Sequence, residues 1–159
     1  MQITVIAVGK IKEKFLKDGI AEYEKRLSSF VKLQIIELPE ERRPVSCSEL
    51  QEHAAKNREG DRILAAIPTG ALVIALEITG SSWGSRQLAE AFRQGELSGK
   101  NHFVFIIGGD IGLDPQVLER SDLRLSLSRM TFTHQMARLI ILEQVYRAMK
   151  ITRGEPYHK

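Results

Sequence analysis

The chain has 159 residues, 43% of them hydrophobic and 27% charged, a composition that predicts one globular domain with its own core. Its net charge of +3 permits a polyanionic partner but does not require one. The longest purely apolar run, 71–76, is too short to cross a membrane, and no basic residue precedes the apolar stretch at the N-terminus. We therefore expect a cytoplasmic protein without a signal peptide. Cys47 is the only cysteine, which excludes an internal disulfide and a cysteine-based metal site.

The N-terminal half predicts two strands and two helices. Apolar residues and their spacing predict a strand at 3–8, a helix over about 12–28, a strand at 31–38 and a largely polar helix that ends near Ile67. Pro39 and Pro44 bracket a loop before the second helix. Ser46 followed by Glu49 is a capping-box pattern, and we expect it to open that helix.

The C-terminal half continues the alternation. The pattern predicts a strand at 71–78, a helix capped by Ser85, a strand at 103–107, a short helix begun by Asp114 and Pro115, a strand at 123–127 and a long helix from Thr133 to about Thr152. Neither repeats nor a domain-sized linker interrupt this order. It predicts an α/β fold with a single domain over 1–159, built as a layered sandwich with a mostly parallel sheet.

Three loops form the candidate site, because ligands of such sheets bind beyond the carboxyl ends of the strands. They follow three consecutive predicted strands, at 77–84, 108–112 and 128–133. Gly108, Gly109 and Gly112 follow a buried strand without completing either familiar glycine fingerprint for nucleotide phosphates. Spacing alone leaves two interpretations with equal weight, a ligand close to the backbone or simple turn glycines. The segment SRMTFTH likewise suits an adenine ring or an ordinary helix start, and we expect His134 to be a helix-start residue.

The last predicted helix and the basic residues indicate partners. Apolar residues spread over more than one face between 135 and 151, so we expect a second subunit to cover this helix, the alternative being a central helix in a monomer. Lysines crowd the first loop, and further basic residues crowd the C-terminal end. The candidate RNA contacts from these clusters are Lys10, Lys12, Arg153 and Lys159, the alternative being an ordinary solvated face.

Longer motifs along the chain together resemble one family. They are AVGKIKEKF, EYEKRL, LEITG, FVFIIGGDIGL, LSLSRMTFTHQMARLIILEQVYRAMKI and RGEPYHK. The sequence is similar to the bacterial RlmH family of SPOUT-class methyltransferases from its first strand to its last residues, and the C-terminal third is the most specific part. Residues 42–60 carry little of the resemblance. Thr133 stands where the family commonly has proline, and we expect this difference to affect the helix start more than the chemistry.

The resemblance implies a fold, an activity and partners. It implies a SPOUT-type fold with a C-terminal trefoil knot, and a homodimer formed through the last long helix, in which each site borrows groups from the partner subunit. It implies methylation of N3 of a pseudouridine in 23S ribosomal RNA, with S-adenosylmethionine as cofactor and without a metal. Since the chain has no appended RNA-binding domain, we expect the substrate to be the assembled ribosome or large subunit.

The resemblance also implies site residues. The cofactor contacts carried over from the family are Leu76, Gly108, Gly109, Leu127, Ser128, Arg129, Met130, Thr131 and Phe132. Tyr157 and His158 match the family's terminal Tyr-His pair and are the candidate catalytic residues. Gly154 ends the helix and Pro156 keeps its predecessor out of helical geometry, so we expect Tyr157, His158 and Lys159 to extend from the body.

Other functions remain to be separated from this one. The same class of enzyme could act on another RNA, such as transfer RNA, and a non-catalytic ribosome-assembly factor could use the fold only to bind RNA. A flavodoxin-like FMN module is a third alternative. It would need a Ser/Thr/Gly-rich phosphate loop after the first strand, where this chain has GKIKEK at 9–14.

Overall fold

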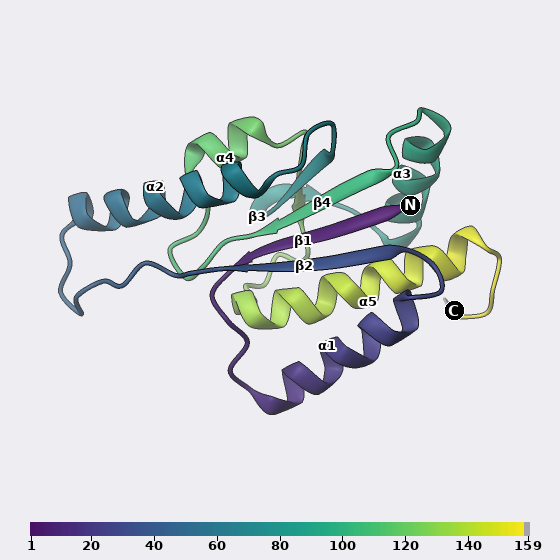
Figure 1. Cartoon of the computed structure of the whole chain (residues 1–159), viewed down its shortest axis with the longest axis horizontal. Helices are drawn as coiled ribbons and strands as arrows, with labels where there is room; N and C mark the ends of the chain where they lie inside the picture. The colour runs from purple at the N-terminus through teal and green to yellow at the C-terminus, as the bar shows by residue number, and fades with distance from the viewer. Residues whose placement is uncertain (158–159) are drawn as a thin grey trace.

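The computed structural model describes residues 1–157 and contains one five-stranded sheet with helices on both faces (Figure 1). All pairs are parallel, and the strand order is β2–β1–β4–β3–β5. The strands are β1 (Gln2–Val8), β2 (Lys32–Leu38), β3 (Leu72–Ser82), β4 (His102–Ile107) and β5 (Leu123–Ser126). The helices are α1 (Lys14–Leu27), α2 (Glu49–Ala66), α3 (Ser85–Leu97), α4 (Pro115–Arg120) and α5 (His134–Thr152). Within the described residues, no helix is long and apolar enough to cross a membrane.

This architecture confirms the α/β alternation and the parallel sheet expected from the sequence. Two predicted helix caps are also confirmed. Thr133 accepts the backbone N–H of Met136 at 3.2 Å and begins α5, and Asp114 accepts the backbone N–H of Gln116 at 2.8 Å and begins α4. The threonine that departs from the family pattern therefore acts as an N-cap.

Two other predicted helix starts are wrong. The second helix begins after Ser48 rather than at the Ser46 pattern, because Ser48 and Gln51 bond each other's backbone N–H groups in a capping box. The third helix takes Gly84 as its N-cap, and the hydroxyl of Ser85 instead donates to a side chain of α5. Both starts differ because a local pattern does not say which of two nearby residues has a better partner.

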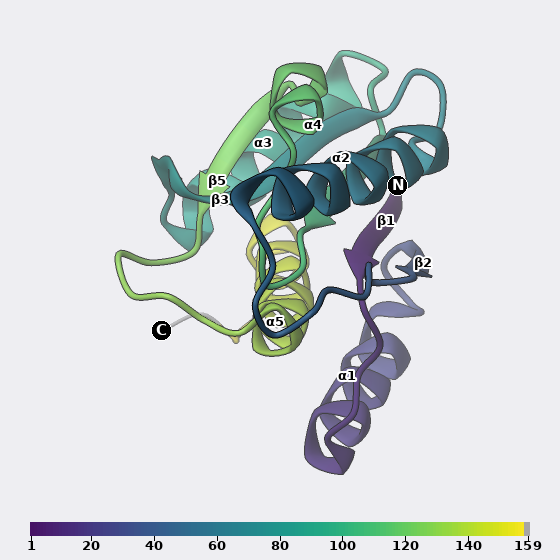
Figure 2. The ribbon, with the colours of Figure 1, turned by 90° about the vertical axis from the view of Figure 1, so that its left-hand side faces the viewer.

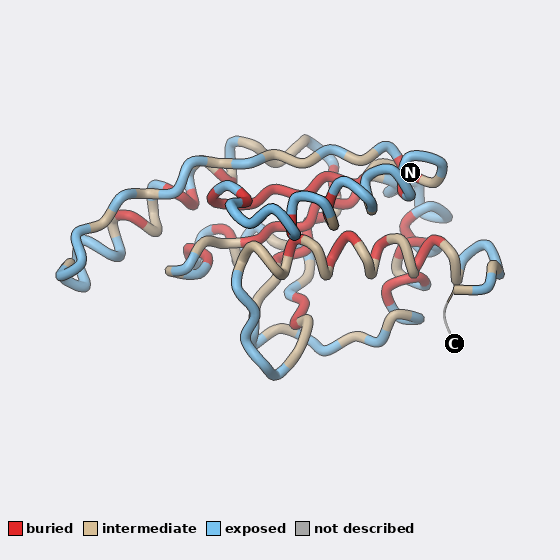
Figure 3. Tube along the Cα trace, turned by 90° about the horizontal axis from the view of Figure 1, so that it is seen from below, coloured by how far each residue is buried: buried red, intermediate tan, exposed pale blue. Residues whose placement is uncertain are grey.

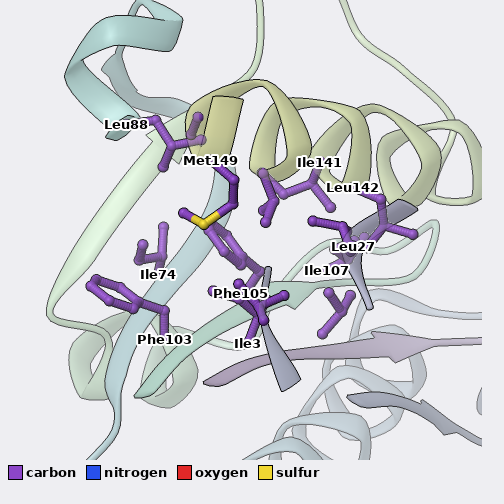
Figure 4. Packing of buried hydrophobic residues seen from close by; sticks show 14 of the residues in the cluster. Ile3, Leu27, Ile74, Leu88, Phe103, Phe105, Ile107, Ile141, Leu142 and Met149 are labelled. Atoms are coloured by element: carbon purple, nitrogen blue, oxygen red, sulfur yellow. The ribbon is translucent and has the colours of Figure 1, made fainter. Parts of the chain in front are cut away.

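The two faces of the sheet bury two separate sets of side chains. In β1, Ile3, Val5 and Ala7 point toward α1, α3 and α5, whereas Ile6 and Val8 point toward α2 and α4. Figure 4 shows the first set, in which β1, β3 and β4 pack against α5. Because both faces are covered, the central strands are buried almost throughout, as is usual for parallel sheets (Figure 3).

The third strand runs beyond its predicted end and contains a bulge that shapes the site. Leu76 and Ser81 both lie opposite Leu125 of β5, so residues 77–80 are extra residues on β3. Gly80 permits this close approach, since a Cβ at that position would lie 2.7 Å from the backbone of β5. The bulge directs 77 and 78 away from the sheet, toward the cleft described below.

A buried arginine joins α5 to the end of β1. The guanidinium of Arg138 donates to the carbonyl oxygens of Gly9 at 2.8 Å and Val8 at 3.3 Å, and to Glu37 Oε1 at 2.7 Å. Its side chain is 1% exposed, whereas that of Glu37 is 37% exposed. The arginine thus satisfies two carbonyls at the end of β1 and fixes the start of α5 beneath them.

We expect Arg138→Met to lower the free energy of unfolding by about 2–4 kcal/mol, because two buried carbonyls lose their donor while Glu37 can be hydrated. Urea unfolding measures the change. The control is Arg93→Met, which removes a solvent-screened, exposed pair with Glu90 and should change the free energy of unfolding much less. Equal losses in the two variants would contradict the anchoring role of Arg138.

Candidate functional site

A cleft of about 860 Å³ opens beside the bulge of β3 and at the carboxyl end of β4. Figure 2 looks onto this edge of the sheet, with α2 above it and α1 and α5 below. The cleft is lined by residues of 13–16, 76–78, 107–113 and 131–137. Its volume is within the range of sites that bind small molecules and cofactors.

A smaller hollow of about 110 Å³ lies beside the cleft, under the loop that follows β5. The two share part of their lining, including Leu76, Ile78, Thr131, Phe132 and Ala137. Residues 125–128 close the hollow on the side of β5. The bulge of β3 and the ends of its neighbours β4 and β5 therefore surround one continuous region.

The structure brings together most of the residues expected to contact a cofactor. Those that line the cleft or the hollow are Leu76, Gly108, Gly109, Leu127, Ser128, Met130, Thr131 and Phe132. Arg129 is exposed on the same loop and lines neither space. Of the first predicted loop, 77 and 78 line the site, whereas 81 and 82 pair with β5. Binding of a cofactor by these residues stays a prediction.

Serine hydroxyls hold the loop after β5 in a compact turn. Ser126 donates to the carbonyl of Ser128 at 2.9 Å, and the Ser128 hydroxyl accepts the N–H of Met130 at 3.0 Å. The turn leaves Met130 76% and Phe132 41% exposed at the rim of the site. Two large apolar side chains held out beside a cleft are typical of a surface that a ligand or a second chain covers.

The glycines after β4 are required first by the chain itself. A Cβ on Gly108 would lie 3.0 Å from the carbonyl carbon of Gly112 and 3.1 Å from Leu113, and one on Gly109 would lie 3.2 Å from Val8. Gly112 has a φ of +77°, which favours glycine. The close approach expected at these glycines is therefore made by neighbouring protein atoms. Their backbone nevertheless lines the cleft.

A buried carboxyl lies behind the loop 108–112, called the glycine loop below. Glu59 of α2 is 2% exposed and accepts the N–H of Glu41 at 2.9 Å through Oε1. Within the described residues Oε2 has no hydrogen-bond partner, and it lies 3.6 Å from the place of a Cβ on Gly109. Burial raises the pKa of Glu59, and the nearby carboxylates of Glu40 and Asp110 raise it further.

Acidic side chains give the cleft its charge. Glu13, Glu77 and Asp110 contribute carboxylates to the lining. Asp110 accepts from Arg43 at 2.6 Å, whereas Glu13 and Glu77 form no ion pair with any residue in 1–157. A cleft with unpaired carboxylates attracts a cationic ligand and repels the phosphates of a nucleic acid.

Sequence reasoning missed the contribution of the first helix. Glu13 and Phe15 line the cleft, and Phe15 is 61% exposed. The signal was present, because Phe15 is an aromatic residue next to the buried stripe of Leu16 and Ile20 but outside it. His134, expected at a helix start, is the first residue of α5 and also lines the cleft.

Tyr157 folds back onto the helices, contrary to the expectation that it extends from the body. Its hydroxyl lies 3.3 Å from Tyr23 Oη and 3.3 Å from Glu143 Oε1, and its ring packs edge-on against Tyr146. Aromatic packing and two hydrogen bonds outweigh the local effect of Pro156. Burial, above all, raises the pKa of Tyr157 well above its usual value, so the phenol stays protonated. His158, the other candidate catalytic residue, lies outside the described residues.

The candidate RNA contacts lie at opposite ends of the subunit. Lys10 and Lys12 are exposed in the loop after β1, on the cleft side. Arg153 follows α5 at the other end, where it donates to the carbonyl of Ser29 at 3.3 Å and lies 4.2 Å from the ring of Phe30. Lys159 lies outside the described residues. One subunit therefore does not gather the described candidates into a single surface.

Comparisons with known proteins agree over the full length. The family model described as "Predicted SPOUT methyltransferase" matches residues 1–158. A relative from Methanoregula boonei is 55% identical over 159 residues, which is 100% of both chains. Relatives from Acetivibrio thermocellus and Carboxydothermus hydrogenoformans, each named ribosomal RNA large subunit methyltransferase H, are 50% identical over 159 residues and 100% of both chains.

Solved structures share the fold at low identity. A Legionella pneumophila protein in complex with the bound cofactor SAM has a TM-score of 0.52 at 14% identity, over 93% of this chain and 66% of that one. A Haemophilus influenzae protein has a TM-score of 0.53 at 14% identity, over 99% of this chain and 70% of that one. At this identity the likeness establishes the fold alone.

We expect Glu59→Gln to weaken the pH dependence of stability. A carboxyl whose pKa is raised by folding stabilises the fold when protonated, so this stability is lost as pH rises from about 4.5 through the raised pKa. The amide keeps an acceptor for Glu41 and cannot ionise. Urea unfolding across this pH range should show a smaller decline in the variant. A decline identical to that of the unmodified chain would contradict the assignment.

Proposed function

We propose that this chain transfers a methyl group from S-adenosylmethionine to N3 of a pseudouridine in 23S ribosomal RNA. The chain belongs to the SPOUT methyltransferase family and, within it, to the family of ribosomal RNA large subunit methyltransferase H (RlmH). The observation that carries the proposal is the acidic cleft, lined by the bulge of β3, the end of β4 and the loop that leads into α5. The substrate is the assembled ribosome or large subunit, and the enzyme acts in the cytoplasm.

The cleft suits S-adenosylmethionine in shape and charge. Leu76, Ile78 and Phe132 offer apolar surface for an adenine ring, and the backbone of 127–132 offers hydrogen-bonding groups at its edge. The carboxylates of Glu13 and Glu77 face a space in which the sulfonium and amino groups of the cofactor would be attracted. The bound cofactor supplies a methyl group that is already activated, so the protein has to orient the acceptor and remove a proton from N3.

The residues that follow α5 offer two candidate groups for that proton. Tyr157 is a neutral phenol and cannot act as the base near neutral pH. His158 is the candidate to accept or orient the proton, because an unperturbed imidazole titrates near neutral pH.

A homodimer would complete the site. Tyr157 packs beside Tyr146, which is about 14 Å along α5 from Ala137 in the cleft, since a helix rises 1.5 Å per residue. The residues that follow α5 (the tail, from 153 on) are therefore better placed to reach the cleft of a partner subunit than that of their own. Two copies related by a two-fold axis with antiparallel α5 helices would bring Arg153 of one subunit toward Lys10 and Lys12 of the other.

The outward side of α5 supports this arrangement. From 134 to 151 every residue of α5 is buried or half-buried, with α1 and α3 flanking the helix (Figure 3). Met136 and Ile140 lie one turn apart on the side turned away from the sheet. Phe15, 61% exposed at the start of α1, adds apolar surface beside the cleft.

The SPOUT-type trefoil knot belongs to the same proposal. The chain leaves β5 at one edge of the sheet, and α5 then packs beneath β1, where Arg138 contacts Val8 and Gly9. A return of the chain from β5 to a position beneath β1 supports a knot in the C-terminal half.

We expect Ala137→Leu to weaken S-adenosylmethionine binding at least about tenfold, because the added carbons enter the region shared by cleft and hollow. Calorimetry measures the affinity. Ala65→Leu, the same change at an exposed position on α2, is the matched control and should bind normally. A substitution at Gly108 would be a poorer test, since it also displaces the carbonyl of Gly112. Normal binding by a folded Ala137→Leu protein would contradict the placement of the cofactor.

We expect the protein to be a dimer in solution and Ile140→Glu to abolish the dimer, because an unpaired charge in an apolar interface is costly. Light scattering gives the mass of each protein. Glu96→Gln, on the exposed end of α3, should leave the dimer intact. A monomeric mass for the unmodified protein would rule out the composite site.

A further inference from the structure

A chain of polar contacts crosses three helices and ends at Tyr157. Ser85 of α3 donates to Gln144 Oε1 at 2.6 Å, and the amide of Gln144 donates to Glu143 Oε2 at 2.6 Å. The other oxygen of Glu143 accepts from Tyr157, whose hydroxyl also contacts that of Tyr23 on α1. Helices far apart in the sequence are thus joined through one carboxylate of α5.

The direction of the hydrogen bonds follows from the carboxylate. Glu143 is an acceptor, so Tyr157 must donate its only proton to it. Tyr23 must then donate to the oxygen of Tyr157, since that oxygen has no second proton. Each of the two tyrosine hydroxyls therefore has a defined role, and loss of the Tyr23 hydroxyl removes the only hydrogen bond that the Tyr157 oxygen accepts within the described residues.

Packing holds the ring of Tyr157 in place, in addition to the hydrogen bonds that hold its hydroxyl. The ring meets that of Tyr146 edge-on, with centroids 4.9 Å apart, and the guanidinium of Arg147 lies 4.7 Å from its centroid. Arg147 is held in turn by Glu143 at 2.5 Å. The ring of Tyr157 is therefore held by an aromatic neighbour and by a cation that is itself fixed by an ion pair.

We propose that Tyr23 and Glu143 are positioning residues, which hold Tyr157 and thereby set the point from which His158 begins. The proposal rests on the role of His158 in the proposed function. It assigns Tyr157 to anchoring the tail, with the hydroxyl used within the subunit. A base that follows directly on a fixed residue has less conformational freedom to lose when it meets the substrate.

The test compares Tyr23→Phe with Tyr146→Phe. The first removes the donor to Tyr157, whereas the second removes a hydroxyl that makes no hydrogen bond among residues 1–157 and keeps the ring. Methyl transfer to ribosomes should show kcat lowered about threefold to tenfold in Tyr23→Phe, with KM for S-adenosylmethionine unchanged. Carboxypeptidase should release the last residues faster from Tyr23→Phe than from Tyr146→Phe.

Tyr23→Phe in a His158→Ala background distinguishes an effect of Tyr23 through His158 from a general effect on the structure. If Tyr23 acts through His158, Tyr23→Phe causes no further loss of transfer in that background. A further loss of similar size, or an unchanged kcat in the single variant, overturns the proposal while leaving the proposed function intact. Full activity of His158→Ala alone would instead refute the role of the tail on which the proposal rests.

Discussion

The guanidinium of Arg138 links the parts of this fold that form the site. It lies beneath the sheet and donates to the carbonyls of Val8 and Gly9 at the end of β1, the strand between β2 and β4. Through it, the first turn of α5 is held against the sheet, and so is the loop that precedes α5 and lines the cleft. A buried arginine is costly unless it is hydrogen-bonded. Here two carbonyls and a carboxylate accept from its two terminal nitrogens, whereas Nε has no partner within the described residues.

The proposed site combines an acidic cleft with basic residues that lie outside this cleft in a single subunit. Carboxylates line the cleft, where a cationic methyl donor is attracted, whereas the basic residues suited to RNA lie outside it. Tyr157 and Arg153 are at the far end of α5 from the cleft of their own subunit. The proposed two-fold dimer would resolve this separation, because it would bring the end of one α5 to the start of the other. The fold therefore gives a reason for a composite site.

Much of the fold could be predicted because its signals are local. Apolar alternation identified the buried strands, and the Thr133 and Asp114 caps followed from patterns of two to four residues. The capping box failed by two residues, because Ser46 and Ser48 carry equivalent patterns and only the tertiary structure decides between them. The three site loops were identified from the rule for strand ends, and eight of nine predicted cofactor contacts line the site.

What the sequence could not predict depends on contacts between distant residues. The requirement for glycine at position 80 depends on which strand lies beside β3. Glu59 is buried only because α2 packs behind the glycine loop. Tyr157 was predicted to extend because Gly154 and Pro156 act locally, whereas its partners Tyr23 and Glu143 are 134 and 14 residues away. Local geometry sets where a helix ends, and long-range packing sets where the following residues lie.

The proposed activity is measured directly by methyl transfer from isotopically labelled S-adenosylmethionine to ribosomes that lack the modification, followed by mass mapping of the 23S ribosomal RNA. We expect one labelled methyl group, on N3 of a pseudouridine, in assembled ribosomes or large subunits. Labelling of transfer RNA in place of 23S RNA would contradict the proposed substrate. Binding of both the cofactor and the ribosome without any transfer would contradict the assignment as an enzyme.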